Sequence, residues 1–226
     1  MNHEQHSIGW YRARLGNITG SMVGLIMKSG KSKTFSDTAE SYLYQLAAER
    51  TMKPEIINDD ELFEEYLRQV NVSTKAMQWG TEQEANARSL YETIHGIHCV
   101  ELGSCKHPTI EQFASSPDGF FYNEEKGIKG CLEIKCPIQS TYIKYTQIQS
   151  PEDLKKVKPE YYWQCMAHMA CTGADTTIFI AYCPWQSYPM HIVEIPRDEA
   201  EISLMLQRVT EANAFIQNIT SKTTIF

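Results

Sequence analysis

The segment CLEIKC, residues 131–136, constrains the fold most strongly, because it combines the pattern of a buried β-strand with two opposite charges. Its cysteines, leucine and isoleucine predict a core strand. Side chains two residues apart on a strand point to the same face, so Glu133 and Lys135 share one face. An unpaired charge is costly in a core, so we expect this face to meet a polar site. The alternative is an ordinary surface salt pair, which stabilises by about 0–1 kcal/mol.

Hydrophobic periodicity predicts further helices and strands along the chain. Helices are expected at residues 36–51, 58–70, 81–96, 159–172 and 197–219. Strands are expected at residues 97–105, 112–122, 131–136, 176–183 and 190–195. This order predicts an α/β fold with a central mixed sheet flanked by helices. We find no internal repeat and no linker rich in Pro, Gly or Ser, so we expect one domain over residues 1–226.

Composition excludes several classes of protein. No stretch approaches the ~20 apolar residues of a membrane span, so no membrane partner is expected. The first residues carry no charged-then-apolar signal segment, which predicts a cytoplasmic location. The seven cysteines lack CxxC spacing, which argues against zinc or iron–sulfur sites and favours reduced, buried thiols. With a net charge of −7, any contact with DNA must rest on local basic groups or bound cations.

A turn at residues 117–119 can bring a second carboxylate to the strand. A hairpin from this turn to Gly130 would place Asp118 close to Glu133 and Lys135. Two partly buried carboxylates repel each other and lose hydration, and a divalent cation relieves both costs. Ligands that are all oxygen favour Mg²⁺ or Mn²⁺.

This combination of groups suits the hydrolysis of phosphodiesters. A metal ion polarises the phosphoryl oxygen and lowers the pKa of a bound water, and a second ion ~4 Å away would stabilise the leaving oxygen. Lys135 could hold the water beside the metal and help to deprotonate it. Glu84, in an expected helix, could add a third carboxylate, or could simply be solvated.

Five blocks of the sequence, taken in order, resemble the phage lambda exonuclease family, the viral-recombinase (YqaJ-type) branch of the PD-(D/E)xK nucleases. The blocks are WYRARLGNITGS (10–21), WGTEQEANAR (79–88), SSPDG (115–119), LEIKCP (132–137) and YYWQ (161–164). The resemblance runs from about residue 7 to residue 195. It implies a restriction-endonuclease-like core with a central mixed sheet.

The same resemblance implies an activity and partners. The activity is that of a Mg²⁺-dependent exonuclease that degrades one strand of double-stranded DNA from its 5′ end. It releases mononucleotides and leaves a 3′ single strand for homologous recombination by strand annealing. Two Mg²⁺ ions are expected, with Mn²⁺ as a substitute. The resemblance also implies a ring-shaped homotrimer that threads DNA, and a single-strand annealing protein as partner.

Carried over by position, the resemblance assigns catalytic and metal-binding roles. Asp118 and Glu133 would bind the catalytic metal, with the main-chain carbonyl of Ile134 as a further ligand. Lys135 would orient the attacking water. Glu84 would complete the acidic cluster through water.

Four other residues match positions that bind a terminal 5′-phosphate in the family: Arg14, Ser21, Ser116 and Gln164. The chemistry fits, because arginine offers a planar fork of donors to phosphate, and hydroxyl and amide groups add hydrogen bonds. Without the resemblance, the sequence favours a surface position for Arg14. It favours for Gln164 a place in a helix with hydrogen bonds to its own surroundings.

Further positions suggest contacts with DNA. Tyr161 matches a tyrosine of the family and is expected to line the site. His168 lies on the same helix face but has no such match, so we interpret it as a helix histidine and not a metal ligand. Met77 falls where the family uses an apolar residue to split the duplex end, and such a wedge can unstack a base step.

The basic segment KSGKSK, residues 28–33, is similar to a nucleotide-binding loop but lacks its upstream glycine spacing and the helix start. We therefore reject ATP binding. Lys28 and Lys31 could instead touch duplex phosphates, or the segment could be a solvated loop.

The sequence leaves two rival functions open. One is a different PD-(D/E)xK nuclease, such as an endonuclease or a repair nuclease with an iron–sulfur cluster, which the cysteine spacing disfavours. The other is a DNA-end-binding module that has lost catalysis. The intact set of Asp118, Glu133 and Lys135 favours an enzyme.

Overall fold

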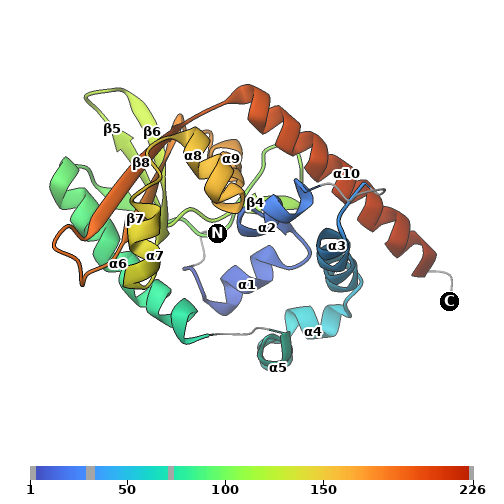
Figure 1. Ribbon diagram of the computed structural model, residues 1–226. Coiled ribbons are helices and arrows are strands. Elements are labelled where there is room, and N and C mark those ends of the chain that lie inside the picture. The colour runs from blue at the N-terminus through green and yellow to red at the C-terminus, as the bar shows by residue number, and fades with distance from the viewer. Residues whose placement is uncertain (1–3, 29–33, 71–73, 224–226) are drawn as a thin grey trace.

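A computed structural model describes residues 4–28, 34–70 and 74–223 of the chain. Its larger sheet has the strand order β2-β5-β6-β7-β8, with β6 at the centre (Figure 1). The strands are β2 (Cys99–Val100), β5 (Gly119–Asn123), β6 (Ile128–Lys135), β7 (Thr176–Tyr182) and β8 (Met190–Pro196). β6 and β7 are parallel and the other neighbours are antiparallel, so the sheet is mixed, as predicted.

A smaller sheet adjoins the larger one and has the order β1-β4-β3. Its strands are β1 (Ile18–Thr19), β3 (Cys105–Lys106) and β4 (Phe113–Ser115). The chain passes from β4 through Ser116, Pro117 and Asp118 directly into β5. This short link places residues from the small sheet beside the centre of the large one.

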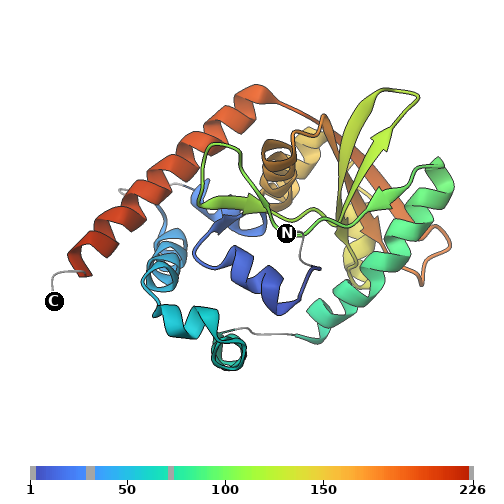
Figure 2. The ribbon, with the colours of Figure 1, turned by 180° about the vertical axis from the view of Figure 1, so that it is seen from behind.

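Helices cover both faces of the larger sheet, with α6 on one face and α9 on the other. The helices of the described residues are α1 (Ile8–Arg14), α2 (Gly20–Ile26), α3 (Asp37–Arg50), α4 (Pro54–Asn58), α5 (Asp60–Val70), α6 (Lys75–His95), α7 (Gln139–Tyr145), α8 (Pro151–Val157), α9 (Pro159–Thr172) and α10 (Glu199–Thr223). The long helices α6 and α10 lie on opposite sides of the molecule in both views (Figures 1 and 2). No helix in the described ranges is both long enough and apolar enough to cross a membrane.

The central strand β6 separates two parts of the core. Leu132 and Ile134 belong to the core cluster that includes residues of α6. Cys131 belongs to the cluster on the other face, with residues of α9. Because side chains alternate along a strand, Glu133 and Lys135 extend from the α9 face. The strand is a core strand, as its sequence predicted, and its two charges share one face.

Most of the predicted elements are present, but two expected strands and several boundaries differ from the structure. The expected strand at 97–105 was wrong, because this segment contributes only β2 and the first residue of β3, in different sheets. The expected strand at 112–122 is divided into β4 and β5, since Pro117 cannot donate a ladder hydrogen bond. The helix expected from residue 81 begins at Lys75, where the Thr74 hydroxyl accepts a hydrogen bond from the Met77 N–H at 3.2 Å.

Other predictions hold. The expected hairpin is formed by β5 and β6, and α6 ends at Gly96, whose φ of +63° suits a glycine C-cap. The helices α1, α2, α4, α7 and α8 were missed, because runs of five to seven residues are too short to show a helical period.

All seven cysteines are free thiols, and five of them are buried. Burial raises the pKa of thiols such as Cys99 and Cys131 to about 12, which disfavours the thiolate form that binds metals. The expected burial is confirmed for these five thiols, while Cys105 and Cys136 are only partly buried.

Candidate active site

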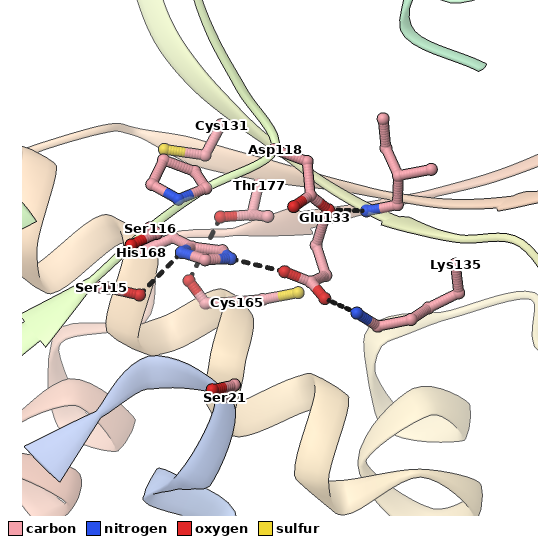
Figure 3. Close-up of polar contacts among 12 residues, drawn as sticks. Ser21, Ser115, Ser116, Asp118, Cys131, Glu133, Lys135, Cys165, His168 and Thr177 are labelled. Carbon is pink, nitrogen blue, oxygen red and sulfur yellow. Dashed lines mark hydrogen bonds and ion pairs between the residues drawn. The ribbon is translucent and has the colours of Figure 1, made fainter. Parts of the chain in front are cut away.

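Asp118 and Glu133 meet across the β5–β6 ladder. Gly119 pairs with Leu132, so Asp118, one residue before β5, stands opposite Glu133 in the same register. The Asp118 N–H donates to the Leu132 carbonyl at 3.0 Å. The Asp118 Oδ2 in turn accepts a hydrogen bond of 2.6 Å from the Ile134 N–H (Figure 3). The hairpin thus brings the two predicted carboxylates together at the end of the central strand.

The Glu133 carboxylate is fully buried and has a partner at each oxygen. Its Oε1 forms an ion pair with the Lys135 Nζ, from the same strand. Its Oε2 lies 2.6 Å from the Nε2 of His168, on α9 (Figure 3). Such pairing offsets the desolvation of a buried charge. It explains physically how a core strand accommodates a glutamate.

Electrostatics differ sharply among the three central groups. Burial alone would raise the pKa of Glu133, but Lys135 and His168 outweigh it and hold that pKa below its ordinary value. Burial opposes the charge of Lys135, yet Glu133 and Asp118 raise its pKa. Burial raises the pKa of Asp118, and the nearby charges of Glu133 and Glu84 raise it further. The surroundings therefore favour the charged forms of Glu133 and Lys135 and disfavour the charged form of Asp118.

Glu84 approaches this group from α6. It lines the same cavity as Ile134 and Lys135. Burial raises the pKa of Glu84, and Lys135 partly opposes that shift. The expected third carboxylate is thus in electrostatic range of the other two.

His168 is the main residue that sequence reasoning missed. It is a helix histidine, as predicted, but its buried ring bridges two side chains: Nδ1 lies 2.8 Å from the Ser115 Oγ, and Nε2 contacts Glu133. The available signal was its spacing from Tyr161 and Gln164, which places the three residues along one side of α9.

Three of the four expected phosphate-binding residues form one hydrogen-bonded group. Arg14 donates from Nη1 to the Ser116 Oγ at 3.3 Å and from Nη2 to the Ser21 Oγ at 3.4 Å. The Trp10 indole N–H also donates to Ser116, and the Arg14 guanidinium lies 4.1 Å from the Trp10 ring centroid. Gln164 is buried on α9, and within the described chain no hydrogen bond joins its side chain to the other three.

Two adjoining cavities connect these groups. A cavity of about 840 Å³ contains Lys135, Glu84 and Tyr161. A second cavity, of about 710 Å³, contains Arg14 and Trp10. The residues that line both cavities are His6, Ser21, Met77 and Thr81. Lys135 and Glu84 therefore lie in a space that shares a wall with the space beside Arg14.

Only some of the residues expected to contact DNA lie at the two cavities. The Tyr161 ring lies 5.2 Å from the Lys135 Nζ, and Met77 is 58 % exposed at the wall between the cavities. Lys28 is exposed and is not among the residues that line these two cavities. Lys31 lies outside the described residues. The structure brings Tyr161 and Met77 to the site, but not Lys28.

Groups that could hold a metal ion are limited to a small oxygen set. Across residues 4–28, 34–70 and 74–223, no three or more His, Cys, Asp or Glu side chains are arranged as a metal cluster. The expected ligands are two carboxylates and one main-chain carbonyl. Glu133 Oε1 is buried and has no hydrogen bond of normal geometry, although it contacts the Lys135 ammonium. A cation at this oxygen would displace or share that contact.

Comparison with known proteins identifies relatives of this chain. Residues 9–175 match the model of the YqaJ-like viral recombinase domain. An alkaline exonuclease from Laribacter hongkongensis (LHK-Exo) is 30 % identical, with a TM-score of 0.70 over 96 % of this chain and 98 % of that one. The structure of LHK-Exo in complex with dAMP is similar at 31 % identity, with the same TM-score and coverage. A search of curated protein sequences found no match.

A further structural neighbour supports the fold. A phage-related exonuclease from Haemophilus somnus is 18 % identical, with a TM-score of 0.66 over 92 % of this chain and 96 % of that one. Together with the sheet topology, these similarities confirm the predicted α/β fold with a restriction-endonuclease-like core.

Removing the His168 ring should destabilise the protein. In His168→Ala, the Glu133 Oε2 would remain buried without its partner, so we expect the free energy of unfolding to fall by about 1–3 kcal/mol. Chemical denaturation monitored by circular dichroism measures this change. The matched control is His98→Ala, which removes an exposed histidine paired with Glu92. It should lower the free energy of unfolding by only about 0–1 kcal/mol. Equal losses in the two variants would contradict the role assigned to His168.

Proposed function

Because the chain belongs to the YqaJ-like viral recombinase family, we propose that it is an exonuclease that degrades one strand of a DNA duplex from its 5′ end. It would release mononucleotides and leave a 3′ single strand for recombination by strand annealing. Family membership confirms the resemblance read from the five sequence blocks, and similarity to an alkaline exonuclease supports a nuclease hydrolase. The observation that carries the proposal is the convergence of Asp118, Glu133 and Lys135 at the end of β6, where Lys135 lines a cavity that adjoins the cavity of Arg14.

The oxygen set at the end of β6 fits a divalent cation. We assign Mg²⁺, with Mn²⁺ as a substitute and two ions expected, to Asp118, Glu133 and the carbonyl of Ile134. The raised pKa of Asp118 supports this assignment, because a cation would supply the positive charge that this carboxylate lacks. When bound, such a metal lowers the pKa of a water and polarises the phosphoryl oxygen.

Lys135 and Glu84 would act on the attacking water and the phosphodiester. Beside Glu133 and Asp118 the pKa of Lys135 is raised, which favours the ammonium form, a donor of hydrogen bonds. We therefore assign Lys135 to orienting the attacking water and stabilising phosphate charge. Glu84 would complete the acidic cluster through water.

Arg14, Ser21 and Ser116 would hold the terminal 5′-phosphate. Their hydrogen bonds to one another show that the guanidinium and two hydroxyls are already gathered in one place. A phosphate could replace these weak contacts of 3.3–3.4 Å with charge-assisted bonds. Gln164 would join them from α9 when the phosphate is bound.

Other contacts with the duplex end are assigned by position. Tyr161 would line the cavity beside Lys135, and Met77 would act as the apolar wedge between bases. Lys28 and Lys31 would touch duplex phosphates.

The family resemblance also supports a proposed assembly. We propose a homotrimeric ring around double-stranded DNA, with a single-strand annealing protein as partner, in the cytoplasm of the host cell. A net charge of −7 is compatible with this arrangement, because only the lining of the ring must be basic.

Linear duplex DNA is expected to be degraded only with a divalent metal. With Mg²⁺ we predict release of mononucleotides from 5′-phosphorylated duplexes, slower release without the 5′-phosphate, and none in EDTA. Lys135→Ala should reduce the rate by at least about 100-fold, because a charged donor to the transition state is lost, while DNA binding is kept. Acid-soluble nucleotide release and gel-shift assays measure the two quantities.

Lys129→Ala is the matched control, since this exposed lysine lies on the same strand, away from the cavity. It should cleave like the wild type. Cleavage of closed circular DNA would contradict the exonuclease, and full activity of Lys135→Ala would remove that residue from the mechanism.

Arg14→Ala is expected to abolish most of the preference for phosphorylated ends. A lost charge-assisted contact should narrow the rate ratio between phosphorylated and unphosphorylated duplexes by about tenfold or more. Arg12→Ala is the control, because Arg12 lies on the same helix but pairs with the exposed Asp60. An unchanged ratio in Arg14→Ala would show that the terminal phosphate binds elsewhere.

A further inference from the structure

The loop between β7 and β8, residues 183–189, exposes two large aromatic side chains. Trp185 is 68 % exposed and Tyr188 is 86 % exposed. Of the two, Trp185 lines the 840 Å³ cavity together with Lys135 and Glu84. A large exposed apolar side chain at the edge of a functional cavity indicates a binding surface. None of the roles assigned above uses Trp185.

Trp185 is held against a second tryptophan, Trp79 of α6. The two rings are nearly parallel, with an interplanar angle of 13° and centroids 6.0 Å apart. This separation is in the range of offset stacking, in which the rings overlap only in part. Both tryptophans line the same cavity. The two rings therefore cover each other only in part and leave a flat aromatic surface open.

Hydrogen bonds fix the loop that carries Trp185. The Cys183 N–H donates to the Pro189 carbonyl at 2.8 Å, and the Gln186 N–H donates to the Cys183 carbonyl at 3.1 Å. The Tyr142 hydroxyl, on α7, donates to the main-chain carbonyl of Tyr188 at 2.5 Å. A surface that is ordered before a ligand arrives loses less entropy on binding.

The cavity thus combines two kinds of chemistry. One part is charged, with Lys135 and Glu84, and the other is aromatic, with Trp79 and Trp185. A nucleotide has the same two parts, an anionic phosphate and a flat base. Within a duplex the faces of a base are covered by its neighbours, so a stacking surface selects a base that has left the stack.

We propose that Trp185 and Trp79 form a stacking platform for an unpaired nucleobase of the strand that is cut. The inference rests on the proposed function, because Lys135 would hold the reacting phosphodiester in the same cavity. Trp185 supplies the exposed ring, and Trp79 supports it from α6. The platform keeps the separated strand beside the reacting group and tolerates any base, since every base has an aromatic face.

The test compares variants in DNA binding, with Ca²⁺ in place of Mg²⁺ so that binding is measured apart from turnover. The DNA is a labelled duplex with two unpaired nucleotides at a phosphorylated 5′ end. Trp185→Ala should weaken binding by about 5- to 150-fold, the range for loss of one stacked base. Trp185→Phe, which keeps a flat ring, should restore most of the affinity.

Tyr188→Ala is the matched control. It removes a more exposed aromatic ring from the same loop and keeps the main-chain carbonyl that Tyr142 binds. It should bind DNA like the wild type. Equal weakening in Tyr188→Ala and Trp185→Ala would overturn the platform, as would a changed assembly mass in Trp185→Ala alone, which would identify a contact between subunits.

An abasic scan separates stacking from a general loss of structure. An abasic residue is placed at each of the first few positions of the 5′ strand. The wild type should lose affinity at one position, and Trp185→Ala should show no further loss at that position. If Trp185→Ala weakens binding equally at all positions, including every abasic one, the tryptophan supports only the loop and the proposal is wrong.

These results separate the platform from the proposed exonuclease. If the effects of Trp185→Ala and of one abasic position overlap, but no nucleotides are released in Mg²⁺, the exonuclease is contradicted and the platform is supported. If nucleotides are released but the two effects do not overlap at any position, the platform alone is contradicted. Failure of the wild type to bind any of these DNAs would also overturn the platform.

Discussion

The buried carboxylate of Glu133 is the constraint on which the site depends. An ionised carboxylate in a protein core is tolerated only when charges or hydrogen bonds compensate the lost hydration. Lys135 does so from the same strand, and His168 does so from α9. Ser115, at the end of β4, contacts the other nitrogen of His168. One carboxylate therefore fixes the relative positions of a central strand, a helix and the smaller sheet.

Local patterns predicted the parts of the site that lie close together in the chain. Glu133 and Lys135 share a face because they are two residues apart, and Asp118 joins them through a hairpin that turn residues signalled. The contact between the His168 ring and Glu133 was not predictable, because the two residues are 35 positions apart in the chain and only tertiary packing brings them together. Trp185 was missed for the same reason, since its loop meets Trp79 only in the folded chain. Short helices and two-residue strands were also not predicted, because hydrophobic periodicity can be recognised only in longer runs of residues.

The phosphate-binding group was inferred from family resemblance, and not from periodicity. Arg14 comes from α1, Ser21 from α2 and Ser116 from the link between the two sheets, yet hydrogen bonds join them. The wall shared by the two cavities places this group beside Lys135. A terminal phosphate and the next linkage could then occupy neighbouring spaces, which is the geometry that end-dependent cleavage requires. Gln164 is buried on α9 without a hydrogen bond to this group in the described chain, so the role proposed for it rests on the family resemblance.

We propose that Asp118 and Glu133 hold a divalent cation, and that this cation replaces the contact between Glu133 and Lys135. A crystal structure of the protein grown with Mn²⁺, with an anomalous difference map recorded for manganese, tests this claim most directly. We expect an anomalous peak within bonding distance of carboxylate oxygens of both residues, with the Lys135 ammonium moved off the Glu133 Oε1. A well-ordered site without that peak, in which Lys135 still contacts Glu133, would contradict it.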